Sequence, residues 1–266
     1  MCKVLQLSRN TYYYHLRKQD DYEKQAAKAD LEERIFKIFQ QSRNNYGTRK
    51  IKKELSKQGL TISRRRIGRV MNGLELYSNY TVAYYKPQKK RSNEAVIANV
   101  LNREFQQNQK LSVLVSDLTY VRVGKKWHYV CLFVDLFNRE IVGASAGPNK
   151  DAALVYKALS TIKGNLSDVQ LFHTDRGSEF DNQLMAEATE TFGIKRSLSA
   201  KGCPYDNAVA EATYKSFKIE FVYQMNFLTL EQLDLELLDY INWFNNHRIH
   251  QTLGYLTPTE FKQQPL

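Results

Sequence analysis

The sequence has 266 residues, of which 42% are hydrophobic and 25% are charged. This length supports one large domain or two modest ones, and the composition excludes a disordered tail or a fibrous repeat. No apolar run approaches the ~18–20 residues of a membrane span, and the first residues show no cleavable signal pattern. The cysteines, Cys2, Cys131 and Cys203, have unrelated spacings that give neither a disulfide framework nor a zinc site. We therefore expect a protein of the reducing cytoplasm.

Positive charge is concentrated in the first two-fifths of the chain. Residues 1–110 contain 24 Lys and Arg against 10 Asp and Glu, whereas residues 111–266 contain 15 against 18. The net charge of +11 thus divides into +14 and −3. Such asymmetry indicates a nucleic-acid-binding module joined to a chemically different one. A generally solvated surface is the alternative interpretation.

A series of helices is expected before residue 76. Residues 1–30 predict a short helical segment whose turns are broken at Ser8, and apolar spacing predicts a helix from residue 31 to about residue 40. A second helix over residues 48–58 ends at Gly59, and Ser63 can cap a third. Helix, break, helix, turn and basic helix together indicate a helix-turn-helix DNA-binding domain over residues 31–76.

The third of these helices is strongly basic. Arginine suits phosphate contacts and bidentate contacts to guanine in the major groove. A small helical bundle with merely solvated arginines is the alternative. The residues expected to contact DNA here are Arg64, Arg65, Arg66 and Arg69.

A basic linker is expected over residues 77–107, because this stretch lacks a periodic apolar face. Its run Lys89, Lys90 and Arg91 could follow a DNA backbone.

The pattern changes from about residue 108 to an α/β element order. β-Branched runs and turn residues predict three antiparallel strands, and helices then alternate with two further strands before a long helix begins near residue 206. This order is that of a ribonuclease-H-like fold, a mixed five-stranded sheet with flanking helices, over residues 108–225. Residues 226–266 predict a C-terminal helical extension packed on that core.

Three carboxylates fall on three different elements of this core. Asp117 lies in a strand run without a regular polar face, where an uncompensated carboxylate costs several kcal/mol and needs a partner or a metal. Asp175 follows the fourth strand, at the sheet edge where ligands usually bind. Helical spacing places Glu211 on one helix face with Asn207, Lys215 and Lys218.

Carboxylates from three elements suit hard divalent cations. Two metal ions ~3.5–4 Å apart can activate an attacking hydroxyl and stabilise the leaving oxygen of a phosphoryl displacement. Each residue also has a simpler interpretation: Asp117 or Asp175 as a turn residue, and Glu211 as a solvated helix charge. The combination of the three favours the metal site.

The segments that carry these carboxylates resemble the DDE integrase and transposase superfamily. The resemblance is greatest to the catalytic, orfB-type product of the copy-and-paste group of bacterial insertion sequences. The interval of 35 residues between Asp175 and Glu211 is the usual one in that family. The resemblance extends from about residue 2 to residue 263, and its segments are YGTRKIKKELSKQGLTISRRRIGRVM, SDLTYV, FHTDRGSEF, KGCPYDNAVAEATYKSFKIE and YINWFNNHRIHQTLGYLTPTEF.

Position by position, Asp117, Asp175 and Glu211 match the metal-binding triad of the family. Lys218 matches a basic residue that contacts DNA near the active site, and a supporting role beside the triad is implied for Asn207. Asn207 and Lys215 are also expected to contact DNA. The departures are mild and remove no charge that the chemistry needs. They are Leu114 for tryptophan, Ile249 for proline, Thr174 for serine and Phe180 for tyrosine.

The resemblance implies a transposase that cuts element ends to release a 3′-hydroxyl, which then attacks another phosphodiester. It implies two Mg²⁺ ions, with Mn²⁺ as a substitute, and terminal-repeat and target DNA as partners. It also implies a homo-oligomer on DNA and a bacterial, nucleoid-associated location.

The family usually makes its active enzyme as a fusion to an upstream reading frame that carries its own zipper. Because this chain lacks a zipper-like heptad, we expect it to be the catalytic portion. Two alternatives are a stand-alone nuclease or integrase of the same fold, and a DNA-binding regulator of transposition that is inactive without its upstream partner.

Overall fold

The computed structural model describes residues 8–81, 97–200 and 203–264. The chain forms two compact units, residues 1–83 and 84–266, which are described separately below. The predicted linker residues Lys89, Lys90 and Arg91 lie outside the described residues.

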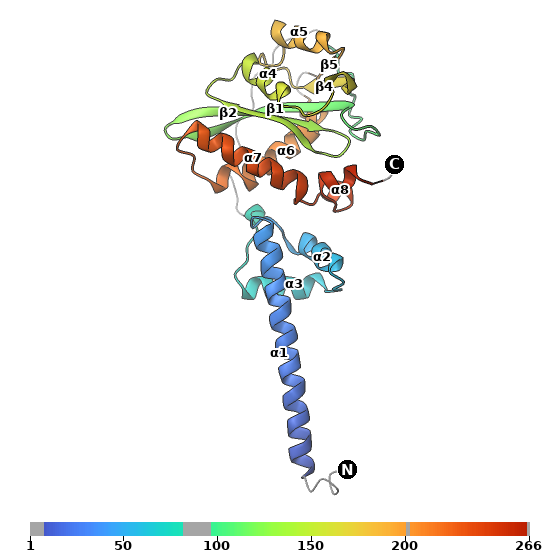
Figure 1. Ribbon diagram of the computed structural model, residues 1–266, viewed down its shortest axis with the longest axis vertical. Helices are drawn as coiled ribbons and strands as arrows, with labels where there is room; N and C mark the ends of the chain where they lie inside the picture. Colours follow the sequence, from blue (N-terminus) through green and yellow to red (C-terminus); the bar gives the residue numbers. More distant parts are fainter. Residues whose placement is uncertain (1–7, 82–96, 201–202, 265–266) are drawn as a thin grey trace. The chain divides into compact units, whose positions relative to one another are not determined.

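The N-terminal unit begins with one long helix, α1 (Arg9–Gln41), where the sequence suggested a separate segment over residues 1–30 (Figure 1). Ser8 caps this helix by accepting the amide of Thr11 at 3.1 Å. No glycine or proline interrupts the 33 residues, and ion pairs one turn apart stabilise the exposed helix surface. The weak apolar periodicity before residue 31 therefore results from the exposure of this part of α1, and the helix continues through it without a break.

The remainder of the unit confirms the expected helices. α2 (Thr48–Lys57) is followed by Gly59, whose φ of +81° favours glycine, and α3 (Arg64–Gly73) is capped by Ser63, whose hydroxyl accepts the Arg66 amide. A short 3₁₀ turn, η1, covers Asn79–Thr81. The three helices bury a common core made of Leu31, Ile35, Ile38, Phe39, Ile51, Leu55, Ile67 and Met71.

The second unit is built on a mixed five-stranded sheet of order β3-β2-β1-β4-β5. β3, β2 and the central strand β1 pair antiparallel, whereas β4 pairs parallel to β1 and β5 pairs parallel to β4. The fold class expected from the sequence is therefore confirmed. The strands are β1 (Val113–Val123), β2 (Lys126–Asp135), β3 (Ile141–Gly147), β4 (Leu171–Thr174) and β5 (Lys195–Leu198).

Helices cover both faces of this sheet (Figure 1). One face packs against α4 (Ala152–Ser160) and α5 (Gln183–Thr191), and the other against α6 (Ala208–Glu220) and α7 (Leu230–Asn246). The short helix α8 (Pro258–Lys262) follows α7. The remaining turns are 3₁₀ helices: η2 (Leu166–Asp168), η3 (Pro204–Asn207), η4 (Val222–Gln224) and η5 (Gln251–Leu253).

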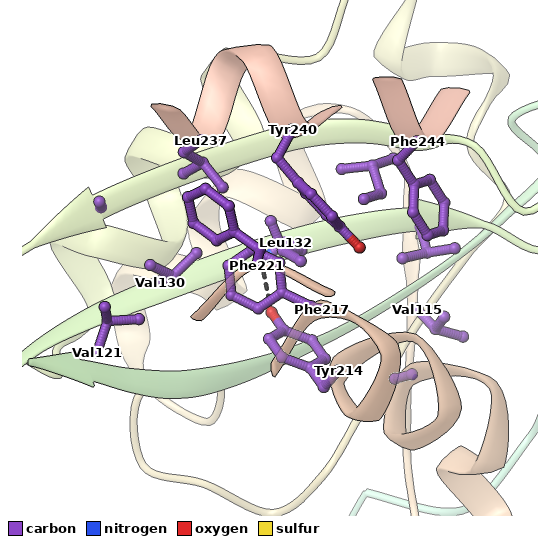
Figure 2. Packing of buried hydrophobic residues seen from close by; sticks show 14 of the residues in the cluster. Val115, Val121, Val130, Leu132, Tyr214, Phe217, Phe221, Leu237, Tyr240 and Phe244 are labelled. Atoms are coloured by element: carbon purple, nitrogen blue, oxygen red, sulfur yellow. Dashed lines mark hydrogen bonds between the residues drawn. The ribbon is translucent and has the colours of Figure 1, made fainter. Parts of the chain in front are cut away.

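The core between the sheet and helices α6 and α7 is rich in aromatic side chains. In Figure 2, Phe217 and Phe221 lie on one side of Tyr240 of α7, and Phe244 of α7 lies on its other side. Tyr240 lies 5.3 Å from Phe217 and 5.1 Å from Phe221 between ring centroids. This packing fixes α6, the helix that carries Glu211, against the sheet.

Within the described ranges, no helix is both long enough and apolar enough to span a membrane.

Candidate active site

Asp117 lies near the middle of β1, on the face of the sheet that α6 covers. Side chains alternate along a strand, and Val115 and Val121 on the same face are buried in the core under α6 and α7. Asp117 itself is half-buried, and its Oδ1 accepts the amide of Leu118 at 2.7 Å. The carboxylate therefore lies at the margin of the core instead of being enclosed on both sides.

Asp175 immediately follows β4, the parallel neighbour of β1. In the register of these strands Val115 is opposite His173. Two residues further along each chain stand Asp117 and Asp175, so the parallel pairing directs both carboxylates to one end of the β1–β4 pair. Asp175 Oδ1 accepts the amide of Gly177 at 3.0 Å, which holds the carboxylate in a turn.

Glu211 lies in the first turn of α6, and its side chain is exposed. Nearby protein nevertheless removes part of its hydration, and this desolvation raises the pKa of the carboxyl above its ordinary value. A neighbouring cation would favour the charged form and lower that pKa. Glu211 thus has the electrostatic character of a carboxylate that gains from a positive partner.

Two contacts on the same side of α6 hold the Glu211 segment against β1. Asn207, four residues before Glu211, donates from Nδ2 to the carbonyl of Ser116 at 3.2 Å. Tyr214, three residues after it, donates its hydroxyl to the carbonyl of Asp117 and accepts the amide of Leu132 at 2.6 Å. The sequence placed Asn207 beside the triad and among the expected DNA contacts; the residue is 4% exposed, ends the turn η3, and anchors the start of α6.

The oxygen donors of this site are of the kind that Mg²⁺ prefers. Asn207 Oδ1 is also buried and takes no hydrogen bond within the described part of the chain, an acceptor that a hydrated cation could satisfy. However, no group of three His, Cys, Asp or Glu side chains among the described residues is placed to hold a metal ion. The donor chemistry fits a divalent cation, and the three carboxylates would have to turn toward one another to share it.

A buried ion pair supports the loop that carries Asp175. The carboxylate of Glu179 is almost fully buried and lies 2.6 Å from Lys150 Nζ, which comes from the loop after β3. A Cβ on Gly177 would lie 2.5 Å from this carboxylate, so the loop folds tightly around it. The sequence did not single out these residues, because Lys150 and Glu179 are distant in the chain and follow no spacing rule.

His173 is a structural residue of β4. It is fully buried, and its ring nitrogens lie 2.8 Å from Ser197 Oγ and 3.2 Å from Ser199 Oγ. Burial lowers the pKa of this histidine to about 4, so the ring is neutral near pH 7. With both nitrogens in hydrogen-bonding contact, His173 orients the end of β4.

The basic residues named by the sequence have different surroundings. The arginines of α3 are all exposed in the N-terminal unit, and Lys215 is exposed on α6. Lys218 is half-buried, with its Nζ 5.3 Å from the centre of the Tyr120 ring. These positions leave α3 open to a ligand and place Lys218 beside an aromatic residue of β1. The exposed arginines are Arg64, Arg65, Arg66 and Arg69.

Three known domain families match successive parts of the chain. An HTH-like domain family matches residues 25–84, and two integrase core domain families match residues 107–204 and 211–266. Asp117 and Asp175 fall within the first integrase match, and Glu211 opens the second.

Relatives from mobile elements align over most of the chain. The putative transposase InsK for insertion sequence element IS150 of Escherichia coli (strain K12) is 29% identical over 99% of this chain and 93% of its own length. The insertion element IS600 uncharacterized 31 kDa protein of Shigella sonnei is 30% identical over 99% of this chain and 98% of its own length. The transposase for insertion sequence element IS904 of Lactococcus lactis is 28% identical over 88% of this chain.

Among solved structures, the HTLV-2 integrase catalytic core domain in complex with magnesium is 17% identical, covers 57% of this chain and has a TM-score of 0.45. The family assignment rests on the sequence relatives and on the domain matches instead. Since those relatives span both units of the structure, the chain belongs to the family of insertion-sequence transposases that contain an integrase core domain.

Proposed function

We propose that Asp117, Asp175 and Glu211 are the carboxylates with which this transposase cuts and joins DNA strands. The observation that carries the proposal is the convergence of three elements. The parallel pairing of β1 with β4 directs the first two residues to one end of the strand pair, and the contacts of Asn207 and Tyr214 fasten the Glu211 helix to the same stretch of β1.

The chemistry follows from oxygen ligands around hard cations. Two bound Mg²⁺ ions, or Mn²⁺ in their place, would polarise the scissile phosphate and stabilise the attacking and leaving oxygens. Asp117 and Asp175 would hold these ions from the sheet, and Glu211 from the helix. No covalent protein intermediate is needed, so the chain requires no Ser, Tyr or Cys nucleophile.

DNA would be held by both units. The four exposed arginines of α3 support phosphate and base contacts by the N-terminal unit, and Lys215 and Lys218 support backbone contacts beside Glu211. We further propose that the active form is an oligomer on terminal-repeat DNA that works with an upstream-frame product, in the bacterial nucleoid.

The direct test uses purified full-length chain and labelled terminal-repeat DNA, with Mg²⁺, Mn²⁺ or EDTA, with and without the upstream product. We expect a nicked strand with a free 3′-hydroxyl and then a joined product, both only with a divalent cation. Cleavage that persists in EDTA would contradict the metal mechanism. DNA binding without cleavage under every condition would instead indicate a regulator of transposition.

A further inference from the structure

An open groove lies at the end of β1 that points away from β4. Its cavity volume of about 620 Å³ is within the range of small-ligand sites. The segment after α6 forms its back wall, because Val123 pairs with Phe227 and the amide of Gly124 donates to the Phe227 carbonyl at 2.8 Å. The side chains that line this groove include Tyr120, Arg122, Trp127, Lys218 and Tyr223.

Three aromatic rings of this groove face solvent. Tyr120, Trp127 and Tyr223 are 41%, 55% and 44% exposed. Tyr120 and Trp127 come from paired strands and meet edge to face with centroids 5.1 Å apart. Exposed rings that already support one another offer a preformed platform for a planar ligand.

The charged side chains that line the groove in the described part of the chain, Arg122 and Lys218, are both positive. Residues 118–134 contain no Asp or Glu, and the β1–β2 hairpin carries Arg122, Lys125 and Lys126. Lys218 adds a cation from α6, and no acidic residue lines the groove in the described part of the chain. Aromatic rings among cations suit a nucleic acid strand, since the rings stack on bases and the cations meet phosphates.

The groove lies close to the carboxylates of the proposed active site. Lys218 is two helical turns after Glu211, or ~10 Å along α6. Tyr120 is three residues after Asp117, which is also ~10 Å along β1. A stacked DNA strand advances ~3.4 Å per nucleotide, so the groove is about three nucleotides from a phosphate held at the carboxylates.

We propose that this groove binds an unpaired nucleobase of the DNA strand that is being cut or joined. The base stacks on Trp127, with the perpendicular Tyr120 ring beside it, and Lys218 and Arg122 contact the flanking phosphates. A base within a duplex cannot present its face to a ring, so the site distinguishes an opened strand end from paired DNA. The position of the bound base relative to the cut rests on the proposed function. Binding of the base in the groove requires neither metal nor cleavage.

The test uses tryptophan fluorescence of the full-length chain without metal. The sequence has two tryptophans, and Trp243 is buried in the α7 core, so a bound base reports mainly through Trp127. We expect an oligothymidylate to quench the emission, and Trp127→Phe to remove most of that quenching. We also expect Tyr120→Ala and Trp127→Ala to weaken single-strand binding about tenfold each and to leave duplex binding unchanged.

Tyr156→Ala is the matched control, because Tyr156 is similarly exposed but lies on α4, outside the groove. Unchanged single-strand affinity in the folded groove variants, or an equal loss for duplex DNA, would overturn the proposal. Loss of base binding in the groove can be distinguished from loss of catalysis at the carboxylates. Glu211→Gln should abolish cleavage and keep the quenching, whereas loss of cleavage has no bearing on this equilibrium measurement.

Discussion

The hydroxyl of Tyr214 bridges β1 and β2 at the residue pair that contains Asp117. It donates to the carbonyl of Asp117 and accepts the amide of Leu132, the residue opposite Asp117 in the antiparallel register. Figure 2 draws the bond between Tyr214 and Leu132. Burial raises the pKa of this tyrosine well above its ordinary value, so the hydroxyl keeps its proton and can serve both strands. One side chain of α6 thereby ties the Glu211 helix to the backbone of Asp117.

Tyr214→Phe should lower the free energy of unfolding by about 1–3 kcal/mol, because it leaves a buried amide and a buried carbonyl without this partner. Urea denaturation measures the change. Tyr156→Phe, on the exposed surface of α4, should have almost no effect. Equal stability of Tyr214→Phe and the wild type would contradict the bridging role.

Lys150→Met should destabilise the chain by about 2 kcal/mol, because it leaves the buried Glu179 carboxylate unpaired. The loss is moderate since the lysine side chain keeps 31% exposure. Adding Glu179→Gln should restore most of the stability in a double-mutant cycle. Lys262→Met, which removes a more exposed partner of Glu140, should cost under about 1 kcal/mol. Equal losses from the two lysines would contradict a supporting role for the Lys150 pair.

His173 predicts a loss of stability in acid. Its pKa is about 4 in the folded chain and ~6.5 when unfolded, so the unfolded state takes up the proton first. The contribution is complete above pH ~6.5 and decreases by about 3 kcal/mol as the pH falls to about 4. His173→Gln should show a shallower decrease in unfolding free energy between pH 7 and pH 4.5. His247→Gln, at the exposed end of α7, should retain the wild-type slope. A wild-type slope for His173→Gln as well would contradict the role of His173 in acid.

The α3 arginines predict a steep salt dependence of duplex binding. Replacing Arg64, Arg65, Arg66 and Arg69 by Gln should reduce the slope of log K against log salt by about 3.6, because each lost phosphate contact removes ~0.9. Fluorescence anisotropy at several salt concentrations measures it.

The control changes four basic residues of α1 that pair with acidic neighbours: Lys24, Lys28, Arg34 and Lys37 to Gln. This variant has the same net charge change and should retain the wild-type slope. Equal slopes for the α1 and α3 variants would show that general charge, and not α3, carries the binding.

Most of the fold could be predicted from local patterns. Alternating and β-branched runs marked the strands, and a cap such as Ser63 marked a helix start. The long helix α1 was divided because the side chains described in its first part are almost all exposed, so no apolar stripe reveals it. Periodicity detects burial, and an exposed helix leaves little periodic signal.

The site could be predicted only in part. The carboxylates stood out because acids in or beside apolar strands are rare and costly. Tyr214, Lys150 and Glu179 did not, since each acts on a residue far away in the chain and only the tertiary structure brings the partners together. Helical spacing placed Asn207 on one face with Glu211, but Asn207 lies in a 3₁₀ turn, so its burial against β1 could not be predicted from that spacing.

The central claim is that Asp117, Asp175 and Glu211 together perform the strand chemistry. Strand joining should be measured with Asp117→Asn, Asp175→Asn and Glu211→Gln on labelled terminal-repeat DNA, with Asp168→Asn as an exposed acidic control on the same unit. Each of the three variants should still bind DNA and lose strand joining by at least a hundredfold, which corresponds to an increase of about 3 kcal/mol in the activation barrier. The control should join strands at the wild-type rate. Joining at the wild-type rate by any one of the three folded variants would contradict this claim.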